Sequence, residues 1–207
     1  MAGRWAAVSR AVAVARGMLG AVTDADTTVG KLLIAEPMLG DPNFERTVVL
    51  MIEHRTEGAL GVVLNRPSDL EVGAVLEEWA DLAAAPSVLY VGGPVEPNGV
   101  LALGRSRGDA VAPGWTPVVG DVGTIDLHLQ PDEVAPGVAG IRFFVGYSGW
   151  GGGQLESELA EGAWLVVDAI ADDVFAPDPE TMWRSVLRRQ GGKVSMLADF
   201  PVHPSLN

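Results

Sequence analysis

The amino-acid sequence predicts an α+β fold with a strongly bent antiparallel sheet and flanking helices. Two β-rich apolar runs, Val48–Ile52 and Ala59–Leu64, are separated by a polar connection of about six residues. A parallel pair would need a crossover of about a dozen residues or more, so these runs predict an antiparallel hairpin. Lys31–Ala35 adds a strand that ends before Pro37. Strands and helices follow without regular alternation, which is typical of α+β domains.

A helix is predicted after the hairpin. Ser68 and Glu71 have the spacing of a capping box, in which each side chain satisfies the other's backbone. Apolar side chains then recur at helical spacing on one face: Leu70, Val75, Leu76 and Trp79. This pattern predicts a helix over residues 69–83 that ends before Pro86.

The middle of the chain predicts short strands over residues 88–91, 100–103, 141–145 and 164–167. Residues 104–117 are rich in turn formers and lack periodicity, so we expect a loop there. The glycine-rich segment Gly146–Gly153 is expected to connect a strand to a short helix that carries Leu155 and Leu159 and ends at Gly162.

The last predicted helix begins at Asp178, an N-cap residue, followed by Pro179 in the first turn. It ends at Gly191, and its apolar face consists of Met182, Trp183, Val186 and Leu187. Basic residues near its carboxyl end complement the helix dipole. They form the one concentrated basic stretch of the sequence: Arg184, Arg188, Arg189 and Lys193.

The composition excludes several classes of protein. The 207 residues include 27 acidic and 14 basic side chains, for a net charge of -13, and 48% are hydrophobic. Such a chain can bury a sizeable core, and its charge disfavours binding to nucleic acid or anionic lipid. The absence of cysteine excludes disulfides and a thiol nucleophile. With only His54, His128 and His203, we expect no metal site.

Residues 1–28 form an amino-terminal extension with three arginines and no acidic residue before Asp24. Its apolar stretches are shorter than the roughly 7 residues of a signal-peptide core or the roughly 20 of a membrane span. We expect a flexible or helical extension, followed by one domain over residues 29–207. Because no long apolar run occurs elsewhere, we expect a cytoplasmic protein without a membrane segment.

His54 is the one histidine among carboxylates, because it follows Glu53 and lies downstream of Asp41 and Glu45. These residue types suit general acid–base chemistry or a weak divalent-metal site. Adjacent strand residues point to opposite faces, however, so Glu53 and His54 cannot orient one ion unless the chain bends. The alternative is a hairpin-end histidine bonded to a nearby backbone group or carboxylate.

The segment Gly146-Tyr-Ser-Gly-Trp-Gly151 does not match the motifs of known catalytic or cofactor sites. A nucleophile elbow needs glycine two residues after Ser148, where this chain has Trp150. No phosphate-binding or dinucleotide-binding glycine pattern can be aligned, so we expect no cofactor. The glycines are interpreted as positions of close backbone approach that let Tyr147 and Trp150 pack.

Several ordered motifs together resemble the bacterial AlgH/YqgE family. They are Gly30–Pro37, Asp41 with Phe44, Glu53-His54, Gly61–Pro67, Gly92–Val95, Gly146–Gly151 and Gln154–Glu156. The resemblance extends from about Gly30 to the closing Pro204–Asn207. It implies an antiparallel sheet bent into a pseudo-barrel with flanking helices, and it implies no established reaction, cofactor or ligand. The family pattern usually has alanine in place of Ser148, which argues against a nucleophile there.

The motif residues are mostly glycine, proline, asparagine and aromatic residues, which shape surfaces but do not transfer protons. The sequence therefore favours a non-enzymatic binding or regulatory protein that contacts an unknown protein partner through a surface built from loops. The candidate residues of this surface are Glu36, Asp41, Phe44, His54, Asn65, Arg66, Tyr147, Trp150, Gln154 and Glu156.

The sequence leaves several alternatives open. One alternative function is an enzyme in which His54 acts with Asp41, Glu53 or Glu156 as acid–base groups or metal ligands. Another is a DNA-binding transcriptional regulator that uses the last helix, a role in which some AlgH/YqgE members are described; the acidic composition disfavours it. Arg66 could bind an anion or pair with Asp69, and a homo-oligomer is compatible with the sequence.

Overall fold

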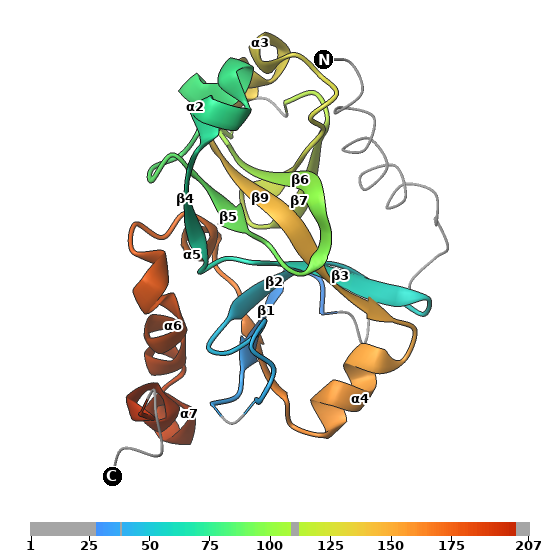
Figure 1. Cartoon of the computed structure of the whole chain (residues 1–207), viewed down its shortest axis with the longest axis vertical. Coiled ribbons are helices and arrows are strands. Elements are labelled where there is room, and N and C mark those ends of the chain that lie inside the picture. Colours follow the sequence, from blue (N-terminus) through green and yellow to red (C-terminus); the bar gives the residue numbers. More distant parts are fainter. Residues whose placement is uncertain (1–27, 38, 109–111, 202–207) are drawn as a thin grey trace.

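The computed structural model describes residues 28–37, 39–108 and 112–201. The chain folds into a curled, mostly antiparallel sheet that forms a half-barrel, with helices around it (Figure 1). The fold class predicted from the sequence is confirmed. Apart from Thr28, the extension predicted over residues 1–28 lies outside the described residues. No helix within the described ranges is long and apolar enough to cross a membrane.

Within the described residues the sheet has 10 strands, and their order along the main path is β10-β1-β2-β3-β9-β6-β8-β7. Strand β4 pairs with β5, which runs parallel to β9. The strand bounds are β1 Lys31–Ala35, β2 Val48–Arg55, β3 Gly58–Val63, β4 Pro67–Glu71, β5 Val88–Val91, β6 Val95–Ser106, β7 Trp115–Val119, β8 Val122–Ile125, β9 Val138–Gly151 and β10 Trp164–Asp168.

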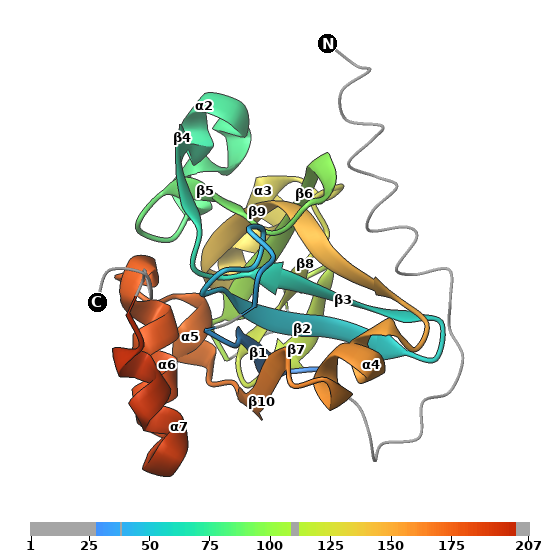
Figure 2. The same ribbon diagram turned by 60° about the horizontal axis from the view of Figure 1, so that its bottom comes forward.

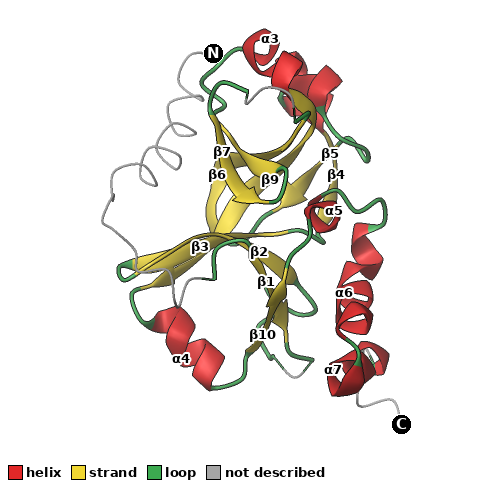
Figure 3. Ribbon diagram, turned by 180° about the vertical axis from the view of Figure 1, so that it is seen from behind, coloured by secondary structure: helices red, strands yellow, loops and turns green. Residues whose placement is uncertain are grey.

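The helices are short and lie in three places around the sheet. Helices α5, α6 and α7 line one side, α4 lies on the opposite side of β1 and β2, and α2 and α3 lie at the far end (Figure 3). The α-helices are α2 Val72–Val75, α3 Pro131–Val134, α4 Gln154–Ala160, α5 Ala171–Val174, α6 Met182–Gln190 and α7 Gly192–Met196. Short 3-10 helices are η1 Glu77–Leu82, η2 Ala135–Gly137, η3 Pro179–Thr181 and η4 Leu197–Asp199.

The predicted hairpin is confirmed as the antiparallel pair β2–β3, in which Leu50 lies opposite Val62. Alternate residues of these strands enter two different cores, because successive side chains point to opposite faces. Leu50 and Val62 pack in the core that also contains Trp183 of α6, whereas Val49 packs in the core beneath α4. Burial on both faces explains why these runs are continuously apolar.

Strand β9 continues through the glycine-rich segment, so the expectation of a connecting loop there was wrong. Along one edge, residues 138–147 of β9 pair with β6; along the other edge, residues 144–145 pair with β5 and residues 148–151 pair with β3. Gly146 lies where this second edge changes partner, has a φ of 69° and would place a Cβ 2.5 Å from the carbonyl oxygen of Gly93. Glycine is therefore required where β9 passes from β5 to β3, and the strand continues through this point instead of ending.

The helix predicted over residues 69–83 was also wrong at its start, because Pro67–Glu71 forms strand β4. The Ser68 hydroxyl donates to the carbonyl of Leu89 at 2.7 Å and accepts from the N–H of Leu70 at 3.2 Å. It therefore binds the neighbouring strand β5 and does not cap a helix. Leu76 and Trp79 are buried as predicted, whereas Leu70 and Val75 are exposed.

Two further expectations can be compared with the structure. The loop over residues 104–117 is shorter than expected, since β6 extends to Ser106 and β7 begins at Trp115. The last helix is confirmed: α6 ends before Gly191 and buries its predicted apolar face. Asp178 lies at the N-cap position of η3, which precedes α6, but its side chain makes no capping hydrogen bond there.

Candidate functional site

Several candidate residues meet where α4 packs against β3, β9 and β10, beside the end of β2 (Figure 2). His54 comes from β2, Trp150 from β9, and Gln154 and Glu156 from α4. Phe44, from the segment before β2, packs against the same core. The structure thus brings together residues that are about 100 positions apart in the sequence.

His54 is held at both ring nitrogens, and only 9% of its side chain is exposed. Nδ1 accepts the backbone N–H of Thr28 at 3.2 Å and lies 3.1 Å from the Thr28 hydroxyl. Because a backbone N–H can only donate, Nδ1 is the acceptor and Nε2 carries the proton. Nε2 then donates to Oε1 of Glu156 at 2.6 Å. This is the arrangement that the sequence left as the alternative to a catalytic or metal site.

The carboxylates near His54 have different environments. A hydrogen bond from its own backbone N–H, and then the one from His54, lower the pKa of Glu156. Burial raises the pKa of Glu53, which lies 3.7 Å from Arg55 across an ion pair. Asp41 accepts the backbone and side-chain N–H groups of Asn43 at 2.8 and 3.1 Å. Of the carboxylates within the described residues, only Glu156 bonds to His54, and no cluster of three or more ligating side chains there could hold a metal.

A carboxylate that the sequence analysis missed, Glu158, fastens α4 to two strands. Its Oε2 accepts the indole N–H of Trp150 at 2.9 Å and that of Trp164 at 2.8 Å. Its Oε1 accepts the side-chain amide of Gln154 at 2.9 Å. Both indoles are almost fully buried, and Phe44 packs edge-on against Trp164 at 5.3 Å. The i,i+4 spacing of Gln154 and Glu158 was the one local signal for this role.

Asn65 and Arg66 hold the chain that leads into β2. Asn65 accepts the N–H of Val48 at 2.9 Å and donates to the carbonyl of Arg46 at 2.8 Å. The Arg66 guanidinium donates to the carbonyl of Glu45 at 3.0 Å. The sequence left Arg66 open between an anion and Asp69, and the structure gives it a backbone partner.

The other motif residues are structural in their contacts. Glu36 donates its backbone N–H to the carbonyl of Ala163 at 3.1 Å. Tyr147 packs against the core that contains α6, and burial, with a smaller effect from Glu96, raises its pKa. Ser148 is fully buried and donates to the carbonyl of Gly92 at 3.2 Å.

A cavity of about 390 Å³ lies away from these residues, between α5 and α6. None of the candidate surface residues lines it. Catalysis at His54 needs a cavity that contains this residue, and this cavity does not contain it.

Two solved structures share the curled sheet and flanking helices of this chain. A crystal structure of a protein from Corynebacterium diphtheriae matches with a TM-score of 0.80 and 32% identity, over 86% of this chain and 95% of that one. The solution structure of the AlgH protein from Pseudomonas aeruginosa matches with a TM-score of 0.64 and 30% identity, over 89% of this chain and 100% of that one.

The sequence relatives identify the family. An AlgH-like family profile matches residues 32–195. A UPF0301 protein from Streptomyces coelicolor is 49% identical over 193 residues, which cover 91% of this chain and 100% of the relative. Another from Thermobifida fusca is 45% identical and covers 86% of this chain and 94% of the relative. The chain therefore belongs to the AlgH-like family, and the resemblance stated from its motifs is confirmed.

The Glu158 clamp yields a stability prediction. We expect Glu158→Ala to lower the free energy of unfolding by about 3 kcal/mol, because two buried indole N–H groups lose a charged acceptor. Glu161→Ala, an exposed change on the same helical segment, should cost less than about 0.5 kcal/mol. Urea unfolding followed by tryptophan fluorescence measures the free energy of unfolding of both variants. Equal losses of stability would contradict the role of Glu158 in holding α4 to the two tryptophans.

The His54–Glu156 contact yields a pH prediction. Since the pKa of Glu156 lies below its usual 4.5 in the folded state, its carboxylate stabilises the fold above that pH. This stability is lost as the pH falls through the lower folded pKa. Unfolding between pH 5 and pH 3 should therefore depend less on pH in Glu156→Gln than in wild type. The difference should stay below about 1 kcal/mol because the carboxylate is half exposed. The control is Glu78→Gln, which changes an exposed glutamate. If Glu156→Gln unfolds with the same pH dependence as the wild type, Glu156 does not stabilise the fold in this way.

Proposed function

We propose that this protein is a non-enzymatic binding or regulatory protein that recognises a partner protein through a surface built from loops. One observation carries the proposal: the polar motif side chains already bond within the chain. His54 bonds to Thr28 and Glu156, Asn65 bonds to backbone groups, and Trp150 bonds to Glu158. Side chains used in this way shape a surface and position its loops.

The part of the surface open to a partner is acidic. Asp41 and Glu156 are exposed, Glu36 is partly exposed, and the chain as a whole carries a net charge of -13. Charge complementarity steers association and suppresses wrong partners, so a basic face on the partner fits this surface best.

The test must change exposed charge without loosening the scaffold, which rules out Trp150 and Asn65 as probes. We expect Glu36→Lys combined with Asp41→Lys to weaken binding of a partner captured by the wild-type protein from bacterial extract at least about tenfold, since like charges then face each other. Isothermal titration with the purified partner measures the effect.

The matched control is Glu77→Lys combined with Asp81→Lys, an equal charge change on exposed residues of η1. It should bind like the wild type. Circular dichroism and thermal melting establish that both variants are folded. A folded Glu36/Asp41 variant that keeps wild-type affinity for every captured partner would remove the proposed surface.

A second candidate function, catalysis at His54, is favoured by a specific geometry. The Thr28 hydroxyl, the His54 ring and the Glu156 carboxylate form a chain with contacts of 3.1 and 2.6 Å, the order of nucleophile, base and orienting acid. Two features oppose it. Thr28 is only 6% exposed, and its own backbone N–H already occupies the Nδ1 lone pair that a base would use.

Labelling with a fluorophosphonate probe separates the two functions. Catalysis by this chain of residues predicts covalent labelling of the wild type that Thr28→Val abolishes. The binding proposal predicts no labelling of either protein. Mass spectrometry of the intact chain gives the result directly.

The DNA-binding alternative receives less support from the basic stretch than the sequence suggested. Arg188 pairs with Asp199 at 3.2 Å, and Arg189 forms a two-point ion pair with the nearly buried Asp173. Two of the four bases thus have acidic partners within the chain, and Arg189 is committed to the nearly buried Asp173.

A further inference from the structure

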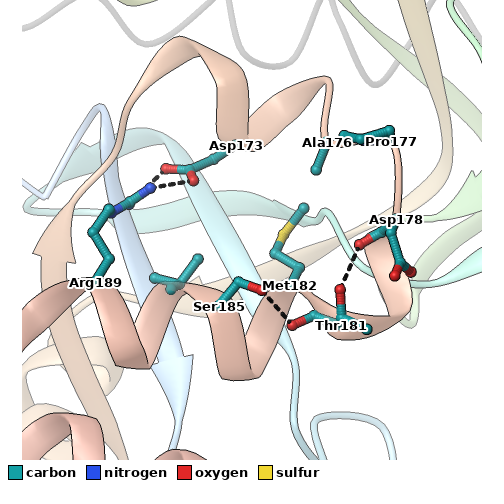
Figure 4. Close-up of a pocket in the computed structure, with 9 residues that line it drawn as sticks. Asp173, Ala176, Pro177, Asp178, Thr181, Met182, Ser185 and Arg189 are labelled. Atoms are coloured by element: carbon teal, nitrogen blue, oxygen red, sulfur yellow. Dashed lines mark hydrogen bonds and ion pairs between the residues drawn. The ribbon is translucent and has the colours of Figure 1, made fainter.

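The cavity between α5 and α6 has the features of a small-ligand site that is separate from the surface proposed above. Its volume of about 390 Å³ lies at the lower end of the range typical of ligand pockets. Figure 4 shows Asp173 and Arg189 at one end of the cavity, Ala176 and Pro177 along one wall, and Met182 of α6 between them.

The walls of this cavity are held in place by two arginines. Arg142 is 1% exposed, and its guanidinium donates to the carbonyls of Val174 at 2.8 Å and Ala176 at 3.3 Å from behind the wall. At the end of the cavity, Arg189 bonds both carboxylate oxygens of Asp173, at 2.5 and 2.8 Å. A site whose walls are already fixed loses little entropy when a ligand binds.

The floor of the cavity is apolar. Met182 and Val186 of α6 are buried beneath it, and Ala176 and Pro177 face them from the segment after α5. An aliphatic chain placed here would contact apolar side chains in place of water, which favours binding.

The polar groups along the α6 edge offer hydrogen-bond acceptors to a ligand. The Thr181 hydroxyl donates its proton to the carbonyl of Asp178 at 3.3 Å, and the Ser185 hydroxyl donates to the carbonyl of Thr181 at 3.1 Å. While these hydrogen bonds are made, the two hydroxyl oxygens have lone pairs to offer, and the exposed Asp178 carboxylate is an acceptor as well. The carboxylate of Asp173 is already satisfied by Arg189 and by the N–H of Ile170 at 2.9 Å.

We propose that this cavity binds a small primary aliphatic amine. Its alkyl chain lies on Met182 and Val186, and its ammonium group donates to the oxygens of Thr181, Ser185 and Asp178. An ammonium carries three donors and no acceptor, so it matches an edge that consists of acceptors. A carboxylate in the same position would face lone pairs and a second negative charge. The inference goes beyond the proposed function, because neither its residues nor its ligand belong to the loop-built surface.

The experiment titrates the full-length protein with hexylamine, 1-hexanol and hexanoate, three probes with the same alkyl length and different head groups. Two-dimensional ¹H–¹⁵N NMR spectra should show that hexylamine shifts the amides of residues 173–189 at millimolar concentrations. Hexanol should bind more weakly, and hexanoate should leave these amides unchanged.

Three variants locate the site. Ser185→Trp places a large side chain at the cavity from an exposed position and should abolish the shifts. Thr181→Val removes one acceptor with little change of shape and should weaken hexylamine binding by roughly two- to fivefold, the size expected of one exposed polar contact. Arg184→Ala, on the same helix but outside the cavity lining, should bind like the wild type.

Each contrary result would overturn the proposal. Hexanoate that binds as well as hexylamine would contradict the acceptor edge. Hexylamine shifts that survive in folded Ser185→Trp, or that spread over the acidic surface instead of residues 173–189, would show non-specific attraction to a chain of net charge -13. None of these results bears on partner binding at Glu36 and Asp41, so the two proposals stand or fall separately.

Discussion

Strand β9 pairs with β6 along one edge and, along the other, first with β5 and then with β3, and the rest of the structure depends on this change of partner. The change occurs at Gly146, where the backbone of Gly93 approaches too closely for any side chain. Beyond it, β9 carries Trp150 to the base of α4 and close to the hairpin that carries His54. The geometry of the sheet therefore requires glycine at position 146 of the glycine-rich motif.

Polar side chains hold together the elements that meet at this end of β9. Glu158 joins α4 to two tryptophans from different strands, and the His54–Glu156 pair ties the same helix to β2 and to Thr28. Asn65 ties the end of β3 to the start of β2. These contacts connect segments that are far apart in the sequence, and a binding surface made of loops needs such connections to keep its shape.

Local patterns predicted the elements whose structure is decided locally. The β2–β3 hairpin followed from two apolar runs and a short connection, and α6 followed from its apolar periodicity and terminal glycine. Prediction failed where a distant partner decided the outcome. Ser68 had the spacing of a helix cap. Its hydroxyl instead donates to the backbone carbonyl of Leu89 in β5, about twenty residues away.

The candidate site was predictable to a similar extent. The resemblance pointed to His54, Trp150, Gln154 and Glu156, which the fold brings together beside α4. Thr28, Trp164 and Glu158 were missed. Their contacts join residues from different elements, and neither the Thr28–His54 contact nor a carboxylate that accepts two indole N–H groups has a signature along the chain. The cavity beside α6 was missed because its wall is held by Arg142, a buried residue of β9 that is distant in the sequence from α5 and α6.

The central claim is that the family's motif residues hold the scaffold and perform no chemistry themselves. Asn65 tests it most directly, because its side chain bonds two backbone groups and no other function is needed to explain it. The measurement is the free energy of unfolding of Asn65→Ala relative to wild type at neutral pH. The account predicts a loss of about 2 kcal/mol from two backbone groups left without partners, whereas unchanged stability would contradict it.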